Sequence, residues 1–122
     1  MKRISVLLTA AVLFCSTPLL AEENYPGPHE AGPTIYTKIF ENERTRASEI
    51  KFEVGEQIPM HTHLYDHFVY VLEAGQLTLS HPDGKTSVVD GKLGQLMWIP
   101  KETHSAVNTG QTVFRALVVE LK

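Results

Sequence analysis

Short runs of β-branched and aromatic residues, each closed by glycine, proline or aspartate, dominate this sequence after residue 33 and restrict what it can fold into. Residues 34–41 and 76–80 alternate apolar and polar side chains, the period of a strand with one buried face. Further strand candidates are residues 47–54, 67–73, 86–90, 95–99, 105–107 and 113–121. No segment combines a sustained 3.6-residue period with helix caps. The pattern predicts an all-β sandwich or barrel with almost no helix after Pro33.

The segments between these runs carry turn chemistry. Residues 24–33 contain three prolines and two glycines, so we expect an irregular lead-in rather than a helix. Asp83-Gly84 favours a tight hairpin between two strands. Closing such a sheet into a barrel also removes exposed strand edges, which would otherwise pair with other chains.

The N-terminus resembles a secretory signal peptide, predicted to span residues 1–21. Lys2 and Arg3 precede an apolar run over residues 4–14, and Ala21 precedes an acidic pair. The run is shorter than the roughly 20 residues that a membrane span needs. A buried first element is the alternative, and a lipoprotein site at Cys15 is disfavoured because Phe14 precedes it. We therefore expect cleavage after Ala21 and a periplasmic or secreted protein.

Removal of residues 1–21 changes what the chain can bind. The mature chain keeps 9 of 11 basic and all 14 acidic residues, a formal net charge of −5, which argues against nucleic acid as a partner. It loses Cys15, the only cysteine, so neither a disulfide nor a thiolate ligand is expected. About 100 residues suffice for one small core, and no membrane association is expected after processing.

Four of the six histidines form a pattern. His61 and His63 are two residues apart, so on an extended strand their imidazoles point to the same face. His67 shares their parity, and a closed barrel could bring His104 across to them. Neutral imidazole is a common ligand of transition metals. The other two histidines, His29 in the lead-in and His81 in the hairpin, are expected to be solvated.

Two linked motifs resemble those of the cupin family. The first, with a glycine, five residues and His-x-His, runs from Gly55 to His67 and continues into a strand that ends near Gly75. The second, with a glycine, five residues, proline and a short turn to histidine, runs from Gly94 through His104 to Asn108. The resemblance implies a double-stranded β-helix, or jelly-roll, barrel over residues 47–121. Residues 22–46 would then form a lead-in and first strand.

The chain also departs from the cupin pattern. His67 stands where most cupins have a glutamate ligand, and Asp66 takes that place if the register slips by one residue. The turn before His104 is one residue short and lacks its glycine, and Gly75 comes one place late.

The resemblance implies a divalent transition metal (Fe, Cu, Ni, Zn or Mn) held by His61, His63, His67 and His104. Four neutral ligands leave the +2 charge uncompensated, which favours anionic partners such as carboxylates or enolates. Candidate proton-transfer residues are Tyr65, Asp66, Tyr70 and Glu102, and Arg115 either holds an anionic substrate or faces water. The candidate cavity wall consists of Phe52, Met60, Val69, Val71, Met97, Ile99 and Phe114.

Two classes of function follow from this site. The first is a metal-dependent enzyme, either a dioxygenase or an isomerase or lyase, that acts on a small anionic or enolisable molecule. The second is a non-catalytic periplasmic module that binds a metal or a small ligand. By resemblance to small cupins we also expect a homodimer, with residues 34–41 pairing across its interface.

Overall fold

The computed structural model describes residues 23–122, so the predicted signal peptide and Cys15 lie outside the described residues. This part contains one short helix, α1 (Pro28–Ala31), and nine strands. The strands are β1 (Tyr36–Glu41), β2 (Thr45–Phe52), β3 (Gln57–Thr62), β4 (His67–Glu73), β5 (Gly75–Ser80), β6 (Thr86–Gly91), β7 (Leu96–Ile99), β8 (Thr103–Asn108) and β9 (Phe114–Leu121). The all-β prediction is confirmed. Across residues 23–122, no helix has the length and apolar character needed to cross a membrane.

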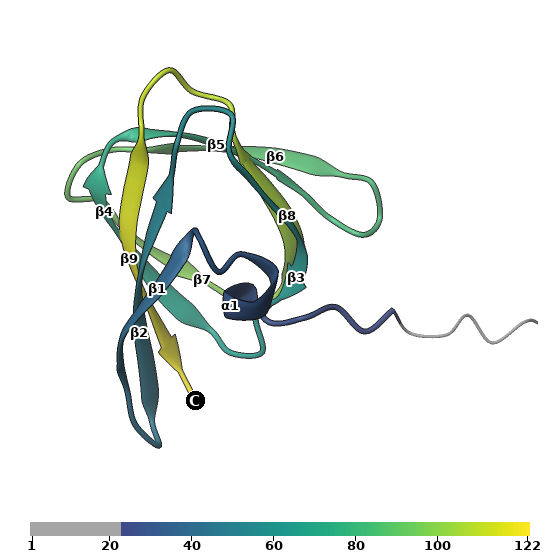
Figure 1. Ribbon diagram of the computed structural model, residues 1–122, viewed down its shortest axis with the longest axis vertical. Coiled ribbons are helices and arrows are strands. Elements are labelled where there is room, and N and C mark those ends of the chain that lie inside the picture. The colour runs from purple at the N-terminus through teal and green to yellow at the C-terminus, as the bar shows by residue number, and fades with distance from the viewer. Residues whose placement is uncertain (1–22) are drawn as a thin grey trace, which may run out of the picture.

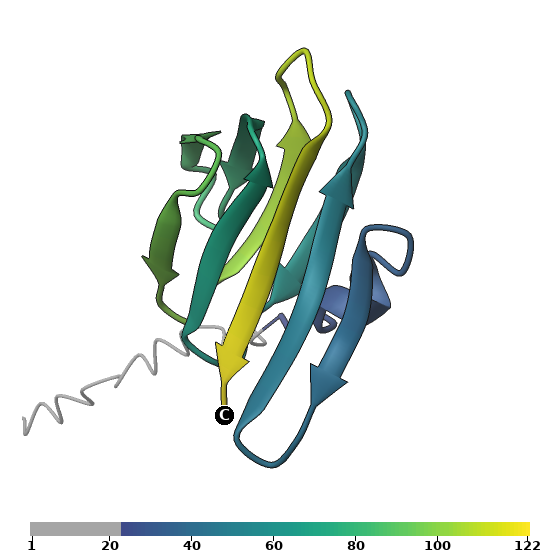
Figure 2. The ribbon, with the colours of Figure 1, turned by 90° about the vertical axis from the view of Figure 1, so that its left-hand side faces the viewer.

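The strands form two antiparallel sheets that face each other as a barrel (Figure 1). The larger sheet has the order β1-β2-β9-β4-β7, and its broad face is seen in Figure 2. The smaller sheet has the order β3-β8-β5-β6. Most successive strands lie in opposite sheets, so closure of the barrel brings distant parts of the chain together.

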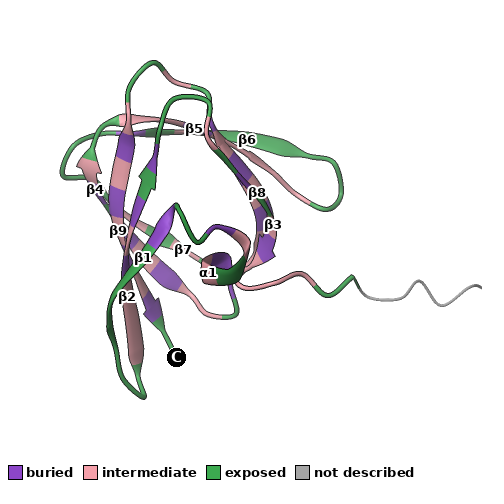
Figure 3. Cartoon of the chain, in the orientation of Figure 1, coloured by how far each residue is buried: buried purple, intermediate pink, exposed green. Residues whose placement is uncertain are grey.

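Alternating burial in the central strands decides which side chains enter the barrel (Figure 3). In β9, Phe114, Ala116, Val118 and Glu120 are buried, whereas the residues between them are half-buried and face outward. Strand β2 pairs with β9 over eight consecutive residues without a bulge. The same parity therefore holds along both strands, and an acidic residue, Glu120, enters the interior at one end.

The apolar core fills the end of the barrel opposite Glu120. Phe52 and Phe114 are paired across β2 and β9, and both are almost completely buried. Burial of one such ring contributes roughly 1.5–3 kcal/mol. Gly91 has to be glycine here, because a Cβ atom would lie 2.6 Å from the Phe114 ring. The remaining core residues are Ile35, Tyr36, Ile50, Ile58, Val69, Val71, Leu77, Ala106, Ala116 and Val118.

The lead-in differs from the prediction. Residues 28–31 form the helix α1 because Pro28 occupies its first turn, where a missing N–H costs nothing. The helix packs on β3, and a Cβ at Gly32 would lie 2.5 Å from the Ile58 side chain. The amide of Thr62 donates to the carbonyl of Pro26 over 2.9 Å. The lead-in thus covers the free edge of β3.

Strand β3 was not among the predicted strand candidates. It contains Pro59, a residue that normally argues against a paired strand. The register between β3 and β8 shifts between Ile58 and His61, and Pro59 lies within this shift. The glycines that begin the two motifs, Gly55 and Gly94, both have φ near +79°, a conformation that favours glycine before each strand.

Candidate metal centre

Strands β3 and β8 bring three of the predicted histidines together. His61 is the direct pairing partner of His104, and their ring centroids are 4.8 Å apart. The backbone continues beyond β3, where the amide of His63 donates to the carbonyl of Glu102 over 2.8 Å. The ring of His63 consequently lies 5.0 Å from that of His61 and 5.2 Å from that of His104. All three side chains are buried.

The nitrogen atoms of this triad are spaced as metal ligands. One ring nitrogen from each of His61, His63 and His104 lies within 4.8 Å of the other two. The Nε2 atoms of His61 and His63 are 3.2 Å apart. Two imidazole nitrogens bound to zinc at about 2.0–2.1 Å and at the tetrahedral angle would be about 3.3 Å apart. The donor set and its spacing therefore fit a divalent transition metal.

The second nitrogen of two of these rings is held by an acceptor. His61 Nδ1 donates to the carbonyl of Pro59 over 2.8 Å, and His104 Nδ1 donates to Glu102 Oε1 over 2.7 Å. Each partner accepts only, so Nδ1 carries the proton and the Nε2 lone pair is available to a metal. His63 Nδ1 is buried and has no hydrogen-bond partner within residues 23–122, and Glu120 Oε1 lies 3.7 Å away. A carboxylate thus stands behind the third ring as well.

His67, the fourth predicted ligand, lies beside the triad but outside it. Its ring is buried on β4 and stacks on that of His63 at 4.4 Å. His67 Nδ1 lies 3.1 Å from the carbonyl of Tyr65, to which it donates. The group of mutually close nitrogens contains only His61, His63 and His104 among the described residues. The structure therefore brings three predicted ligands to one point and places His67 against one of them, His63.

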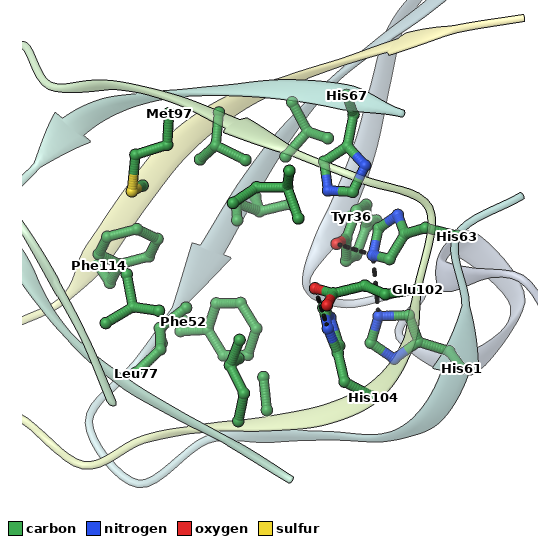
Figure 4. A pocket seen from close by; sticks show the side chains of 17 residues that line it. Tyr36, Phe52, His61, His63, His67, Leu77, Met97, Glu102, His104 and Phe114 are labelled. Carbon is green, nitrogen blue, oxygen red and sulfur yellow. Dashed lines mark hydrogen bonds and ion pairs between the residues drawn. The ribbon is translucent and has the colours of Figure 1, made fainter. Parts of the chain in front are cut away.

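The triad opens onto a cavity of about 70 Å³ between the two sheets (Figure 4). A buried water needs roughly 10–15 Å³ of such space, so several waters or one small molecule fit beside a metal. His67 and Glu102 line the cavity with the triad. Its other walls are mainly apolar and include Ile50, Phe52, Leu77, Val69, Met97, Ile99, Phe114 and Val118.

Comparison with known proteins identifies the family. The family model described as "Cupin domain" matches residues 48–120. The chain belongs to the cupins. The match nearly coincides with the barrel predicted at residues 47–121, and it spans both histidine motifs. No curated protein matches this cupin in sequence.

Solved structures agree with this assignment. A cupin domain from Bordetella pertussis Tohama I is 26% identical over 83% of this chain and 99% of that one, with a TM-score of 0.67. A polyketide cyclase from Streptomyces resistomycificus is 29% identical over 70% of this chain and 63% of that one, with a TM-score of 0.55. An RmlC-like cupin with a double-stranded β-helix from Methanocaldococcus jannaschii is 19% identical over 84% and 92% of the two chains, with a TM-score of 0.59. The last shows the fold alone.

Burial sets the protonation of this cupin's site. Desolvation lowers the pKa of His61 to about 3 and also lowers the pKa of His67. The hydrogen bond from His104 holds the pKa of the Glu102 carboxyl below its usual value. Burial raises the pKa of Glu120, but His63 and Arg46 outweigh it and keep that pKa low as well. Burial thus favours neutral His61, the form in which imidazole binds a metal, while Glu102 and Glu120 stay ionised.

Three of the four predicted proton-transfer residues lie outside the cavity. Tyr70 is 42% exposed because it alternates with the inward-facing Val69 and Val71. Asp66 does not line the cavity; its Oδ1 accepts from the amide of Lys101 over 2.8 Å and so ties two turns together. Of the four candidates, Tyr65, Asp66, Tyr70 and Glu102, only Glu102 lines the cavity.

Several other predicted positions also differ. Val71 is buried in the core, and Met60 lines a separate surface hollow, so neither is in the cavity wall. Arg115 takes the second of its two predicted placements: it faces outward, where its guanidinium binds Glu49 at 2.8 Å. His29, expected in solvent, is half-buried and lies 2.8 Å from Ser48 Oγ. His81 is also half-buried, with its ring 6.2 Å from that of His104.

Two residues of the site were absent from the predictions. Tyr36 lines the cavity from β1, and its hydroxyl lies 3.5 Å from His63 Nε2. Glu120 stands behind His63 from β9. Neither lies in a cupin motif. The sequence signal for Glu120 is its place on the inward-facing side of an alternating strand, where a charged residue requires a partner.

Proposed function

We propose that this cupin is a metal-dependent isomerase or lyase that acts on a small enolisable or anionic molecule. The observation that carries the proposal is the convergence of His61, His63 and His104 at the wall of a small apolar cavity. Three protein ligands leave coordination positions for a substrate, which is typical of catalytic rather than structural metal sites. A bound divalent metal would supply positive charge to stabilise an enolate oxygen.

The residues around the triad can carry out the remaining chemistry. The apolar walls exclude water and limit the substrate to a few heavy atoms. Glu102 is the one carboxylate in the cavity wall within the described residues. Its Oε1 is engaged by His104, so Oε2 is the atom that would take a proton from carbon and return it. The same hydrogen bond fixes the base beside the metal ligands.

The family relationship supports an enzymatic role. The cupin from Streptomyces resistomycificus, 29% identical over 70% of this chain, is described as a polyketide cyclase, so a relative on this fold acts on an organic substrate. That chain is longer, since this one covers 63% of it. The small cavity here suits a smaller substrate than a polyketide.

Deuterium exchange tests the proposed reaction. Protein purified without metal is loaded anaerobically with Zn, Mn, Fe, Ni or Cu, and exchange of acetylacetone protons in D₂O is followed by NMR. We expect faster exchange with at least one metal, and loss of the effect in Glu102→Gln and His61→Ala. The matched control is Asp66→Asn, which alters a carboxylate outside the cavity.

An oxygen-electrode measurement on the same metal-loaded protein in air separates the other classes of function. Oxygen consumption without proton exchange would replace the proposal with a dioxygenase. Metal binding with neither reaction would favour a non-catalytic binding module.

Export and dimerisation complete the proposal. We propose that residues 1–21 are removed on export, which intact mass of the periplasmic protein tests; a retained Met1 or a lipid on Cys15 would contradict it.

We further propose a homodimer through β1, an edge strand that exposes Ile39 (57%) and Phe40 (53%). Light scattering that shows a monomer at micromolar concentration would contradict the dimer.

A further inference from the structure

The hydroxyl of Tyr36 lies at the metal-facing side of His63. Tyr36 begins β1, and its side chain is buried with its ring edge-on to that of His61. Its Oη lies 3.5 Å from His63 Nε2, the nitrogen that also faces His61 Nε2 (Figure 4). Among the residues that line the cavity, Tyr36 is the one that carries a hydroxyl.

Metal binding removes the partner of this hydroxyl. The contact with His63 Nε2 is the only hydrogen bond that Tyr36 Oη makes within residues 23–122. When the lone pair of that nitrogen is given to a metal, it can no longer accept a proton from the phenol. A buried hydroxyl without a partner is unfavourable. The loaded site therefore contains a donor that faces the cavity and needs an acceptor.

We infer that Tyr36 Oη donates a hydrogen bond to an oxygen of the molecule bound beside the metal, and so selects small carboxylates or enolates. This inference rests on the proposed metal centre. One oxygen of such a ligand would occupy the open coordination position, and its second or the same oxygen would accept from Tyr36. A ligand whose free side offers only a donor gains nothing from this residue.

The surroundings hold the Tyr36 side chain in place. His29 packs edge-on against its ring at 5.3 Å and is itself hydrogen-bonded to Ser48. The hydroxyl is thus held over the cavity before any ligand arrives.

Ligand titrations of the cobalt-loaded protein test this role. Cobalt(II) absorption reports binding of formate, which offers a second oxygen, and of imidazole, whose free nitrogen is a donor. We expect Tyr36→Phe to weaken formate binding about ten- to a hundredfold, the usual range for a hydrogen bond to a charged group. Imidazole and cobalt affinities should change by less than about threefold. Tyr70→Phe, which removes an exposed hydroxyl, should change none of these constants.

The outcomes distinguish this inference from the proposed metal centre. Unchanged formate affinity in a cobalt-loaded Tyr36→Phe protein overturns the role of Tyr36 and leaves the metal centre intact. Failure of the wild-type protein to bind cobalt overturns both. Should the variant not fold, carbon-13 NMR of the zinc-loaded wild-type protein gives a second reading. Formate should then shift the Cζ resonance of Tyr36 and not that of Tyr70, and the absence of a shift contradicts the inference.

Discussion

At the residue scale, the site depends on what lies behind each imidazole. The carbonyl of Pro59 accepts from His61 Nδ1, and the carboxylate of Glu102 accepts from His104 Nδ1. Both histidines therefore present a free Nε2 lone pair. His63 has only the more distant carboxylate of Glu120 behind it. Hydrogen-bonded partners of this kind orient metal ligands and raise their basicity.

The first prediction decides the role of His67. Because its ring stacks on His63 outside the nitrogen cluster, His67→Ala should weaken zinc binding by about tenfold or less. His104→Ala removes a member of the cluster and should weaken it by about a hundredfold or more. Competition with a chromophoric chelator measures both constants. Equal losses in the two variants would show that His67 is a ligand and that the centre contains four histidines.

The sequence predicts those parts of the site that local spacing determines. His61 and His63 share a strand face, and His104 follows a recognisable turn. One sequence is therefore enough to predict that these three histidines lie together. Strand parity also excludes Tyr70, since Val69 and Val71 on either side of it face inward. Tyr36 could not be found in this way, because its position beside His63 depends on how β1 closes over the barrel.

At the scale of elements, the turn between β8 and β9 fixes the strand that carries His104. The buried Asn108 amide donates to the carbonyls of Phe52 and Thr112 over 3.0 and 2.9 Å. Its Oδ1 accepts from the amide of Gly110 over 3.0 Å. One side chain therefore connects the ends of β2 and β8 with the following loop.

Replacement of Asn108 should destabilise the whole barrel. Asn108→Ala removes the side-chain partner of the buried Phe52 carbonyl, of the part-buried Thr112 carbonyl and of the Gly110 amide, at a cost of about 3 kcal/mol. For a domain of this size the melting temperature should fall by about 10–20 °C in a thermal unfolding scan. Thr109→Ala, which removes an exposed hydroxyl next to it, serves as the control and should change stability by less than about 1 kcal/mol. Equal melting temperatures for both variants would contradict the role of Asn108.

The sequence predicts the strands better than the segments that cover them. Alternation and turn residues locate β9, whose alternate residues are buried. They also locate β1, although Tyr36 is the only buried residue of that strand. The sequence does not predict β3 because this strand contains Pro59, and proline is unfavourable in a paired strand. The register shift between β3 and β8 accommodates Pro59. Helix α1 is too short to show a period, and its packing on β3 depends on the close approach of Gly32 to Ile58.

At the scale of the whole molecule, the barrel keeps several imidazoles neutral in its interior. Burial lowers the pKa values of His29, His61 and His67 below the 6.5 expected in the unfolded chain, that of His61 to about 3. At a pH between the lowered pKa of such a histidine in the folded state and its pKa of 6.5 in the unfolded chain, the unfolded state binds more protons than the folded state. Folding stability of the metal-free protein is therefore lost as the pH falls through this interval.

The metal-free protein should accordingly become less stable as the pH falls from 7 to 5. This interval lies above the usual pKa of carboxyl groups, so the histidines account for most of the change. Urea unfolding at several pH values measures the effect, and His61→Gln should make the dependence shallower. Stability that stays constant or rises toward pH 5 would contradict the assignment of buried neutral histidines.

The central claim is that one metal ion is held by His61, His63 and His104 at the wall of the cavity. X-ray absorption spectroscopy of the zinc-loaded protein tests it most directly. We predict one zinc per chain, with three imidazole nitrogens at about 2.0–2.1 Å, and two in His104→Ala. Loss of zinc on desalting, or a zinc shell without imidazole scattering, would contradict the account.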